Sequence, residues 1–324
     1  MQKKLNKTLI KLAAILNDGE YHDGNSLGEQ LGMTRSAVWK AIHKLENYEV
    51  KFDSVKGKGY ALLEPLILLD AQRIKKKLTE KVDITIFESI DSTNDYLKSL
   101  KSAKQRSVVC LAEQQTKGKG RLGREWYSPF GKNIYLSCLY PFQKDVSELA
   151  GLSLVTGIAI FRTLQDVGVN KKLYLKWPND VLYDNQKLSG TLIEIQAETH
   201  GASHAVVGIG INVNMLGGDA ITQAWTSLQK ILDKYVDRND LCALLINHLI
   251  ACFRQFNEYG FASFINEWMD AEYLANRAIT LQNLHEKIEG KVVGINEQGH
   301  LLLKLANGKV RAFSSGDASI VKKR

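Results

Sequence analysis

The sequence predicts a multidomain α+β protein, in which a winged helix-turn-helix is followed by an α/β core and a small β-barrel. Three patterns predict this fold class. Helical periodicity leading into a short hairpin occupies residues 1–64, strand-like runs alternate with helices over residues 65–272, and short alternating segments fill residues 273–324. A chain of 324 residues is long enough for each part to bury a core of its own.

The first part has the spacing of a helix-turn-helix. Its second helical pattern, Asn25 to Gly32, meets the third through the short turn Gly32-Met33-Thr34. In the third helix Val38, Ile42 and Leu45 recur at i, i+4 and i+7, so they face a core. The opposite face of this helix carries polar, basic and aromatic side chains: Arg35, Ser36, Trp39, Lys40, His43 and Lys44.

A basic hairpin follows that helix. Val50 to Ser54 and Gly59 to Leu63 alternate like strands around Lys56-Gly57-Lys58, which is typical of the wing of a winged helix. An outward helix face beside such a wing can reach base edges and phosphates, although a solvated helix and an ordinary hairpin would give the same pattern. The predicted DNA-binding residues are Arg35, Ser36, Trp39, Lys40, His43, Lys56 and Lys58.

Charge favours an anionic partner without identifying one. Lys and Arg (43) exceed Asp and Glu (35) by eight over the whole chain. Residues 1–64 hold ten Lys and Arg against eight Asp and Glu, so this part is only weakly basic. We therefore expect DNA binding to rely on dimerisation, which doubles the phosphate contacts, and to weaken as salt rises.

Other composition signals exclude several classes of protein. The four cysteines, Cys110, Cys138, Cys242 and Cys252, form no CxxC pair, so we expect neither a metal site nor a disulfide framework. The N-terminal stretch reads as an amphipathic helix without a cleavage site, and the apolar run from Leu149 to Phe161 is too short to cross a bilayer. These patterns predict a cytoplasmic protein without a membrane partner.

The middle and last parts differ in the length of their strands. Strand-like runs in the middle part interleave with helices and indicate an α/β or α+β core. These runs are Ser107 to Glu113, Asn133 to Tyr140, Leu173 to Trp177, Lys187 to Gln196 and His204 to Asn214. After Tyr273 the strands are short, and Asn307-Gly308 is a strong hairpin signal, which predicts a small β-barrel.

A glycine-rich basic loop is the main candidate for ligand binding. Gly118 to Arg124 places three glycines and three cations in seven residues, which suits a polyanion because glycine lets backbone N–H groups approach phosphate oxygens. The run also matches G-x-G-x-x-G, but Pro129 and Gly131 precede a strand here, whereas a dinucleotide turn opens into a helix. Gly123 is followed by Arg-Glu, which excludes a Walker loop and leaves a flexible basic loop as the alternative.

Three further segments carry polar groups at the ends of regular elements. Lys176 ends an apolar strand before Trp177-Pro178-Asn179-Asp180, where it is either functional or a solvated surface residue. Asp91-Ser92-Thr93-Asn94 precedes a helix and could simply cap it. Gly208-Ile209-Gly210-Ile211-Asn212 indicates either a close approach to a ligand or a strand with two small residues.

Taken in this order and spacing, the segments resemble the biotin protein ligase family and, with the front part, its bifunctional ligase and biotin operon repressor members. The resemblance spans nearly the whole chain. It rests on the segments already quoted, on Ala112-Glu113-Gln114-Gln115 before the loop and on Lys187-Leu188-Ser189-Gly190. One departure is Lys119, where the family usually has arginine, which puts tight retention of an adenylate in doubt.

The resemblance implies a fold and a reaction. The core would be related to class II aminoacyl-tRNA synthetases and lipoate ligases, and the last part would be an SH3-like barrel. Family members use ATP with Mg²⁺ and join the biotin carboxylate to the α-phosphate of ATP. They then pass the acyl group to a lysine of the biotin carboxyl carrier domain of acetyl-CoA carboxylase. The biotinyl-5'-AMP intermediate would act as corepressor, promoting a homodimer that binds operator DNA.

The resemblance also implies roles for single residues. Arg121 and Lys176 would be catalytic, because cations must neutralise a carboxylate brought against a triphosphate. The biotin site would comprise Ser92, Thr93, Asn94, Gln115, Lys119, Gly120, Arg121 and Lys176. The adenylate and ATP site would comprise Gly118, Lys119, Arg121, Arg124, Asn179, Asn212 and Trp225. The alternatives are a sensing repressor whose ligase half is inactive and a lipoate ligase.

Overall fold

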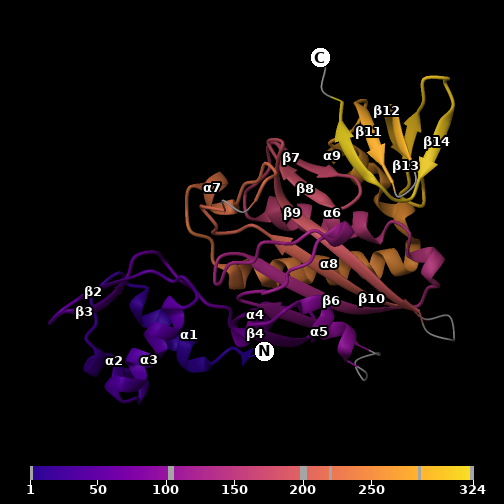
Figure 1. Ribbon diagram of the computed structural model, residues 1–324. Helices are drawn as coiled ribbons and strands as arrows, with labels where there is room; N and C mark the ends of the chain where they lie inside the picture. The colour runs from indigo at the N-terminus through magenta and orange to yellow at the C-terminus, as the bar shows by residue number, and fades with distance from the viewer. Residues whose placement is uncertain (1–2, 101–105, 198–202, 219–220, 284–285, 322–324) are drawn as a thin grey trace.

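The computed structural model describes residues 3–100, 106–197, 203–218, 221–283 and 286–321. A large central sheet with flanking helices lies between two smaller units, the helix-rich N-terminal part at one end and a small β domain at the other (Figure 1). This arrangement confirms the predicted class, an α+β multidomain protein with a helix-turn-helix, a mixed-sheet core and a C-terminal antiparallel β domain.

The N-terminal unit is a helix-turn-helix with a wing. Its elements are α1 (Lys7–Leu16), α2 (Gly24–Leu31), α3 (Arg35–Glu46), β2 (Phe52–Val55) and β3 (Gly59–Leu62). Side chains of Asp23 and Thr34 cap α2 and α3, and Gly32 ends α2 at φ 63°, a left-handed conformation that glycine adopts at no steric cost. Val38, Ile42 and Leu45 are fully buried, as their spacing predicts.

The central sheet has eight strands in the order β1-β4-β5-β6-β10-β9-β8-β7. All adjacent pairs are antiparallel except β4 with β5. The strands are β1 (Lys3–Lys4), β4 (Asp83–Ser89), β5 (Val108–Ala112), β6 (Ile134–Phe142), β7 (Leu173–Lys176), β8 (Asp180–Tyr183), β9 (Gln186–Ala197) and β10 (Ser203–Ile211). Although β1 precedes α1 in the chain, it extends the edge of this sheet.

Helices cover both faces of the sheet. On one face α4 (Ala71–Lys76), α6 (Leu152–Asp166) and α8 (Arg238–Tyr259) pack together, while α5 (Thr93–Ser99) lies on the other against β5, β6 and β10. The segment Val146–Asp166, which contains α6, is apolar enough to cross a membrane by length and composition. Because α6 packs on α8 and the sheet, it is a core helix of this domain. Two short helices, α7 (Leu228–Leu232) and α9 (Ile265–Ala271), complete the domain.

The C-terminal unit is a five-stranded antiparallel sheet in the order β14-β13-β12-β11-β15. Its strands are β11 (Ala278–Gln282), β12 (Lys287–Ile295), β13 (Leu301–Lys304), β14 (Val310–Phe313) and β15 (Asp317–Ile320). Asn307-Gly308 lies in the β13–β14 turn, as predicted. The buried side chains of this sheet belong to the same hydrophobic cluster as those of the central domain.

The segment that joins the N-terminal unit to the core is held along its length. Arg238 and Glu113, both fully buried, approach to 2.7 Å between Nη1 and Oε2. Arg238 Nη2 donates to the carbonyl of Ile67, and the amide of Leu69 donates to Glu113 Oε1 at 2.5 Å. A buried charge needs a partner, and here each charge also satisfies the backbone of the connecting segment. The two units are therefore joined by an ordered connection.

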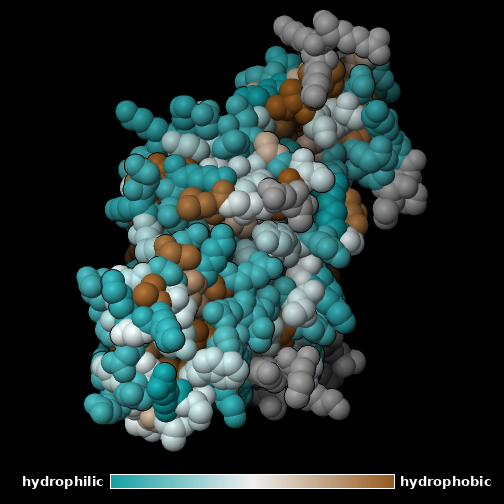
Figure 2. All heavy atoms as spheres, turned by 60° about the vertical axis from the view of Figure 1, so that its left-hand side comes forward, coloured by the Kyte–Doolittle hydropathy of each residue, from teal (hydrophilic) through white to brown (hydrophobic). Residues whose placement is uncertain are grey.

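Most of the visible surface on the N-terminal side is hydrophilic, with hydrophobic residues scattered among polar ones (Figure 2). Two exposed hydrophobic side chains lie where function was predicted. Trp39 of α3 is 48% exposed, and Leu122 of the glycine-rich loop is 65% exposed. Single exposed hydrophobic side chains are common on proteins, so it is their place on the predicted helix face and loop that makes both positions candidates for contact with a ligand or partner.

Candidate functional site

A cavity opens above the central sheet where four separate parts of the chain meet. Its walls come from the start of α5, the loop between β5 and β6, the strands β8 to β10 and the start of β15. The predicted residues that line it are Ser92, Thr93, Asn94, Gln115, Lys119, Gly120, Arg121, Arg124 and Asn179. Segments far apart in the sequence therefore converge on one site, as the prediction of a shared ligand pocket requires.

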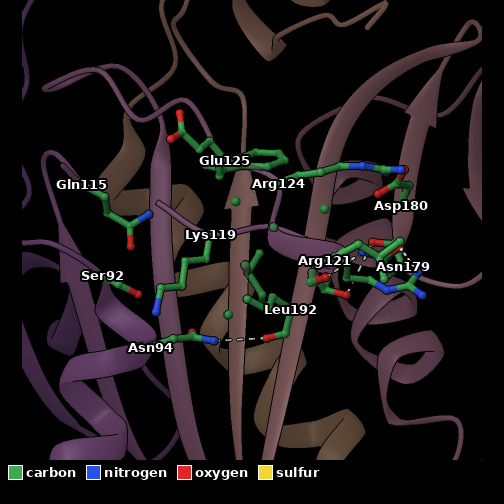
Figure 3. Close-up of a pocket in the computed structure, with 18 of the residues that line it drawn as sticks. Ser92, Asn94, Gln115, Lys119, Arg121, Arg124, Glu125, Asn179, Asp180 and Leu192 are labelled. Atoms are coloured by element: carbon green, nitrogen blue, oxygen red, sulfur yellow. Dashed lines mark hydrogen bonds between the residues drawn. The ribbon is translucent and has the colours of Figure 1, made fainter. Parts of the chain in front are cut away.

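One end of the cavity is lined mainly by hydroxyl and amide groups. Gln115 Oε1 accepts hydrogen bonds from the backbone N–H and the hydroxyl of Thr93, at 2.9 and 3.0 Å. Ser137 Oγ, at the base, donates to Thr93 Oγ1 at 2.7 Å or to Asn94 Oδ1 at 2.6 Å. Ser92 caps α5 and lies beside Asn94 and Gln115 on one side of the cavity (Figure 3). This end supplies donors and acceptors that suit a neutral polar ring.

The glycine-rich loop closes over the cavity as a tight hairpin. Trp126 N–H donates to the carbonyl of Gly118 at 2.9 Å, and Gly120 N–H donates to the carbonyl of Arg124 at 2.7 Å. Leu122 and Gly123 adopt positive φ angles at the tip. Lys119 Nζ, 2.6 Å from Asp95 Oδ2 on α5, extends toward Ser92 and Asn94 (Figure 3). The loop thus spans the cavity and is tied to its opposite wall.

The other end of the cavity is cationic. Arg121 donates from Nη1 to Asn179 Oδ1 and from Nη2 to the carbonyl of Gly316, both at 3.0 Å. Burial lowers the pKa of the Arg121 guanidinium, which still remains charged at neutral pH. Arg124 pairs with Asp317 at the start of β15, so the C-terminal domain reaches the cavity. Figure 3 shows Arg121 and Arg124 across the cavity from Ser92 and Gln115.

A further cation lines this cavity and was not singled out from the sequence. Lys187 Nζ lies 2.7 Å from Asp180 Oδ1, as a close ion pair without aligned hydrogen-bond geometry. It also lies 5.5 Å from the ring centre of Trp126. The indole N–H of Trp126 is buried and has no hydrogen-bond partner among the described residues. Since a buried unpaired donor is costly, this N–H is available to a bound ligand.

Two glycines of β10 make room for the walls of the cavity. A Cβ on Gly208 would lie 2.4 Å from Asn94 Oδ1, and one on Gly210 would lie 2.3 Å from the Trp126 ring. Real side chains do not approach so closely, so both positions need glycine. The paired glycines of this strand therefore make room for the side chains of Asn94 and Trp126. The close approach to a ligand that the sequence suggested stays a prediction.

Four predicted ligand residues do not line this cavity. Lys176 lies on β7, the outermost strand, where it faces Asp180 of β8, so Lys187 rather than Lys176 is the strand lysine at the cavity. Asn212 uses its side-chain N–H groups on the carbonyls of Lys187 and Thr226. The Trp225 ring is covered by Lys230 Nζ at 3.7 Å, and Gly118 is buried beneath the loop.

The residues of the predicted DNA-binding face divide into two groups. Arg35, Ser36, Trp39 and Lys40 are exposed on the first half of α3, and Lys56 and Lys58 are exposed at the wing turn. His43 is half-buried and pairs with Glu46. Lys44, which the periodicity also placed outward, instead contacts Glu88 of the central domain. The outward surface is thus the first half of the helix together with the wing.

Family descriptions match all three parts of the chain. Residues 8–61 match an HTH domain, residues 86–212 match the biotin/lipoate A/B protein ligase family, and residues 275–321 match the biotin protein ligase C-terminal domain. The bifunctional ligase/repressor BirA of Escherichia coli K12 is 38% identical over 98% of this chain and 98% of its own length. The corresponding protein of Bacillus subtilis is 29% identical over 97% of this chain and 98% of its own.

Solved structures agree with these matches. The biotin protein ligase of Aquifex aeolicus in complex with biotin and ATP superimposes with a TM-score of 0.64 at 30% identity, over 74% of this chain and 99% of that one. The ligase of Leishmania major in complex with biotinyl-5-AMP gives a TM-score of 0.50 at 25% identity, over 72% and 99%. The E. coli and B. subtilis matches extend over the helix-turn-helix part as well.

Proposed function

This chain belongs to the biotin protein ligase family, in its bifunctional ligase and repressor branch, and we propose that it forms biotinyl-5'-AMP from biotin and ATP in this cavity. The observation that carries the proposal is the division of one cavity into an end rich in hydroxyl and amide groups, which Lys119 reaches, and an end that holds Arg121, Arg124 and Lys187. The ureido ring of biotin would occupy the end formed by Ser92, Thr93 and Gln115. The biotin carboxylate would meet the α-phosphate of ATP near Arg121 and Lys187.

The charges of the cationic end suit this step. A carboxylate oxygen attacks the α-phosphorus, and pyrophosphate leaves, so negative charge is concentrated between the two substrates. Arg121 and Lys187 would neutralise that charge, and Asn179 would orient Arg121. The lysine amine of the carboxyl carrier domain of acetyl-CoA carboxylase would then attack the acyl carbon, and AMP would leave. Closure of the loop would keep water from the acyl phosphate.

Other substrate contacts follow the same division. Lys119, Gly120 and Arg124 would hold phosphate oxygens or order the loop, and the free indole N–H of Trp126 would donate to the bound adenylate. Trp225 and Asn212 would pack on the adenine only if their segment rearranged. The described residues contain no group of three His, Cys, Asp or Glu side chains fit to hold a metal ion. We propose that Mg²⁺ would bind with the triphosphate, and no step proposed for the chain's own residues depends on it.

Two lysines on strands that β8 separates, Lys176 on β7 and Lys187 on β9, provide a test of the catalytic assignment. Lys187→Ala should lower adenylation by about 100-fold or more, because it removes a cation from a water-excluded transition state. Lys176→Ala is the matched control and should retain most activity. Pyrophosphate release and biotin transfer to a carrier domain would be measured for both. Native rates in Lys187→Ala, with loss in Lys176→Ala, would restore the assignment that the sequence favours.

We propose that biotinyl-5'-AMP also promotes a homodimer that represses transcription in the cytoplasm. In the described chain β8 pairs with β9 only as far as Gly190, and Asn179 bonds the backbone of Thr191, so the part of β9 after Thr191 is an edge beside the cavity. Thr191 and Leu192 line the cavity on that part. An edge strand can pair with a second copy, and a ligand beside it can favour pairing. Operator binding that ignored biotin and ATP would contradict this proposal.

The boundaries of the three functional parts, residues 1–64, 65–272 and 273–324, remain a proposal. The hydrophobic cluster of the N-terminal unit supports the first boundary, although it also takes in Leu66, Leu68 and Phe130. The β1 pairing with β4 and the cluster shared by the last two parts imply that the units are not independent. Limited proteolysis should cut between residues 64 and 65 only slowly, because the connecting segment is hydrogen bonded to Asn17 of the N-terminal unit and to Tyr235 and Glu113 of the core.

A further inference from the structure

A buried carboxylate of the ligase domain is held by the DNA-binding unit. Glu88, on β4, is only 1% exposed. Lys44 Nζ lies 2.5 Å from Glu88 Oε2, and Tyr48 Oη donates to Glu88 Oε1 at 2.7 Å. Both partners come from the end of α3 and the residues just after it. A desolvated charge of one domain is therefore neutralised by side chains of the other.

A second contact fixes the same end of the helix. The Tyr48 ring stacks on Phe130 with centroids 4.3 Å apart and planes inclined by 3°. Phe130 is buried and joins the hydrophobic cluster of the N-terminal unit, although it lies in the ligase domain shortly after the glycine-rich loop. Burial beside Glu88 also raises the pKa of the Tyr48 hydroxyl, which therefore remains a hydrogen-bond donor. Two fixed points prevent this end of α3 from turning.

The other half of α3 is free to meet DNA. Arg35, Ser36, Trp39 and Lys40 are exposed, whereas the side chain of Lys44 is directed to Glu88 and is 33% exposed. Because an α-helix is stiff, a contact that fixes one end of α3 also fixes the direction of its other end. The direction of the exposed half is thus set by a contact with the ligase domain, about one turn away from Lys40.

We propose that Glu88, through Lys44 and Tyr48, is a positioning residue for operator recognition, which sets the direction of α3 and hence the spacing of half-sites that a dimer can bind. The inference rests on the proposed repressor function and extends it to a residue of the ligase domain. Two α3 helices must meet the major groove at a spacing matched to the DNA helical repeat, so a small rotation of each unit changes that spacing.

The test compares Lys44→Met, Glu88→Gln, the double variant and Lys40→Met in the full-length protein. The probe is a duplex selected from a random library by the wild-type protein with biotin and ATP. Lys44→Met and Glu88→Gln should each weaken binding about 5- to 150-fold, the range of typical coupling energies. The double variant should be no weaker than either single variant, because both remove the same contact. Each should also tolerate half-sites moved by one or two base pairs.

Salt dependence separates positioning from direct DNA contact. Loss of a phosphate contact reduces the slope of log K against log salt by about 0.9, so Lys40→Met should lower the slope. Lys44→Met and Glu88→Gln should keep the native slope. A reduced slope in Lys44→Met together with native affinity in Glu88→Gln would overturn the proposal, since Lys44 would then be a phosphate contact.

Biotin transfer to the carrier domain provides the folding control, because Glu88 and Lys44 do not line the cavity. Native transfer with weakened operator binding supports the inference. If Glu88→Gln does not fold, Lys44→Met still carries the test, because Lys44 is partly exposed. If the wild-type protein selects no duplex, the repressor proposal itself has failed. Native operator affinity and native spacing preference in Lys44→Met would contradict the positioning role of Glu88 and would leave the repressor proposal standing.

Discussion

The central domain is joined to its two neighbours in different ways. On the C-terminal side the junction is apolar: the core of the small β domain and that of the sheet form one cluster, and Trp177 Nε1 donates across it to the carbonyl of Gly299 at 3.1 Å. On the N-terminal side the cluster is distinct from that of the sheet and takes only Leu66, Leu68 and Phe130 from beyond residue 64, so the junction depends more on buried polar groups such as Arg238, Glu113 and Glu88. The C-terminal unit is part of the enzyme, whereas the DNA-binding unit is attached by directional contacts.

The largest effect is expected from a substitution that breaks the polar junction on the N-terminal side. Arg238→Met should leave Glu113 buried without a counter-charge and lower the free energy of unfolding by about 3–5 kcal/mol. The double variant Arg238→Met with Glu113→Gln should recover part of that loss, since no charge is then left unpaired. Denaturant unfolding followed by fluorescence would measure both. A loss below about 1 kcal/mol in the single variant would show that the pair is dispensable.

A matched pair of core substitutions tests whether the junctions differ in cooperativity. Leu281→Ala in the C-terminal domain and Leu12→Ala in the N-terminal unit each remove a fully buried leucine, at a cost of about 2–5 kcal/mol. Leu281→Ala should lower the temperature at which biotin transfer is lost, because its cluster extends into the catalytic core. Leu12→Ala should weaken operator binding first. Equal loss of transfer in both variants would contradict the difference between the junctions.

Glu272 should make the C-terminal junction sensitive to pH. Burial raises the pKa of this carboxyl to about 7, although it accepts hydrogen bonds from the Trp268 indole and the Leu274 amide. The folded protein therefore binds a proton that the unfolded chain releases, so the free energy of unfolding falls as pH rises from about 4.5 to about 7. Glu272→Gln should abolish this fall in the free energy of unfolding, which is on the order of 2 kcal/mol over that pH range. An unchanged unfolding profile would exclude Glu272 as its source.

The smallest effects are expected from the two ion pairs that hold the glycine-rich loop. Asp317→Asn removes the partner of Arg124 on the C-terminal domain, and Asp95→Asn removes the partner of Lys119 on α5. Both pairs are substantially exposed, so each should accelerate biotinyl-5'-AMP release by less than about fivefold. Lys119→Arg is the matched control and should slow release, because a planar guanidinium can pair with two oxygens. Stopped-flow fluorescence or filter binding would measure the off-rates.

Local patterns were sufficient for the fold of the N-terminal unit. The spacing of Val38, Ile42 and Leu45 identifies the buried face of α3 because a helix repeats every 3.6 residues. The same pattern placed Lys44 on the outward face, yet this side chain turns to Glu88, 44 residues away. Periodicity gives the faces of a helix and does not give the neighbour that packs against its end.

The proposed catalytic lysine shows the corresponding limit for the site. Lys176 and Lys187 both occupy strands and both lie in segments that the family resemblance quotes. Only the sheet order, in which β8 separates β7 from β9, places Lys187 at the cavity. Asp317 lies 193 residues beyond Arg124, and no local signal joins them. Site residues that share one sequence motif could be predicted. Site residues that only the tertiary fold brings together could not.

The glycines of β10 have a consequence for how this protein can change over time. Gly208 and Gly210 carry no functional group, but a single added methyl group would strike Asn94 or Trp126. A lysine or arginine at the cavity can be exchanged for another cation and still attract phosphate. These two positions have no such substitutes, so the smallest residues of the site should be the least free to vary.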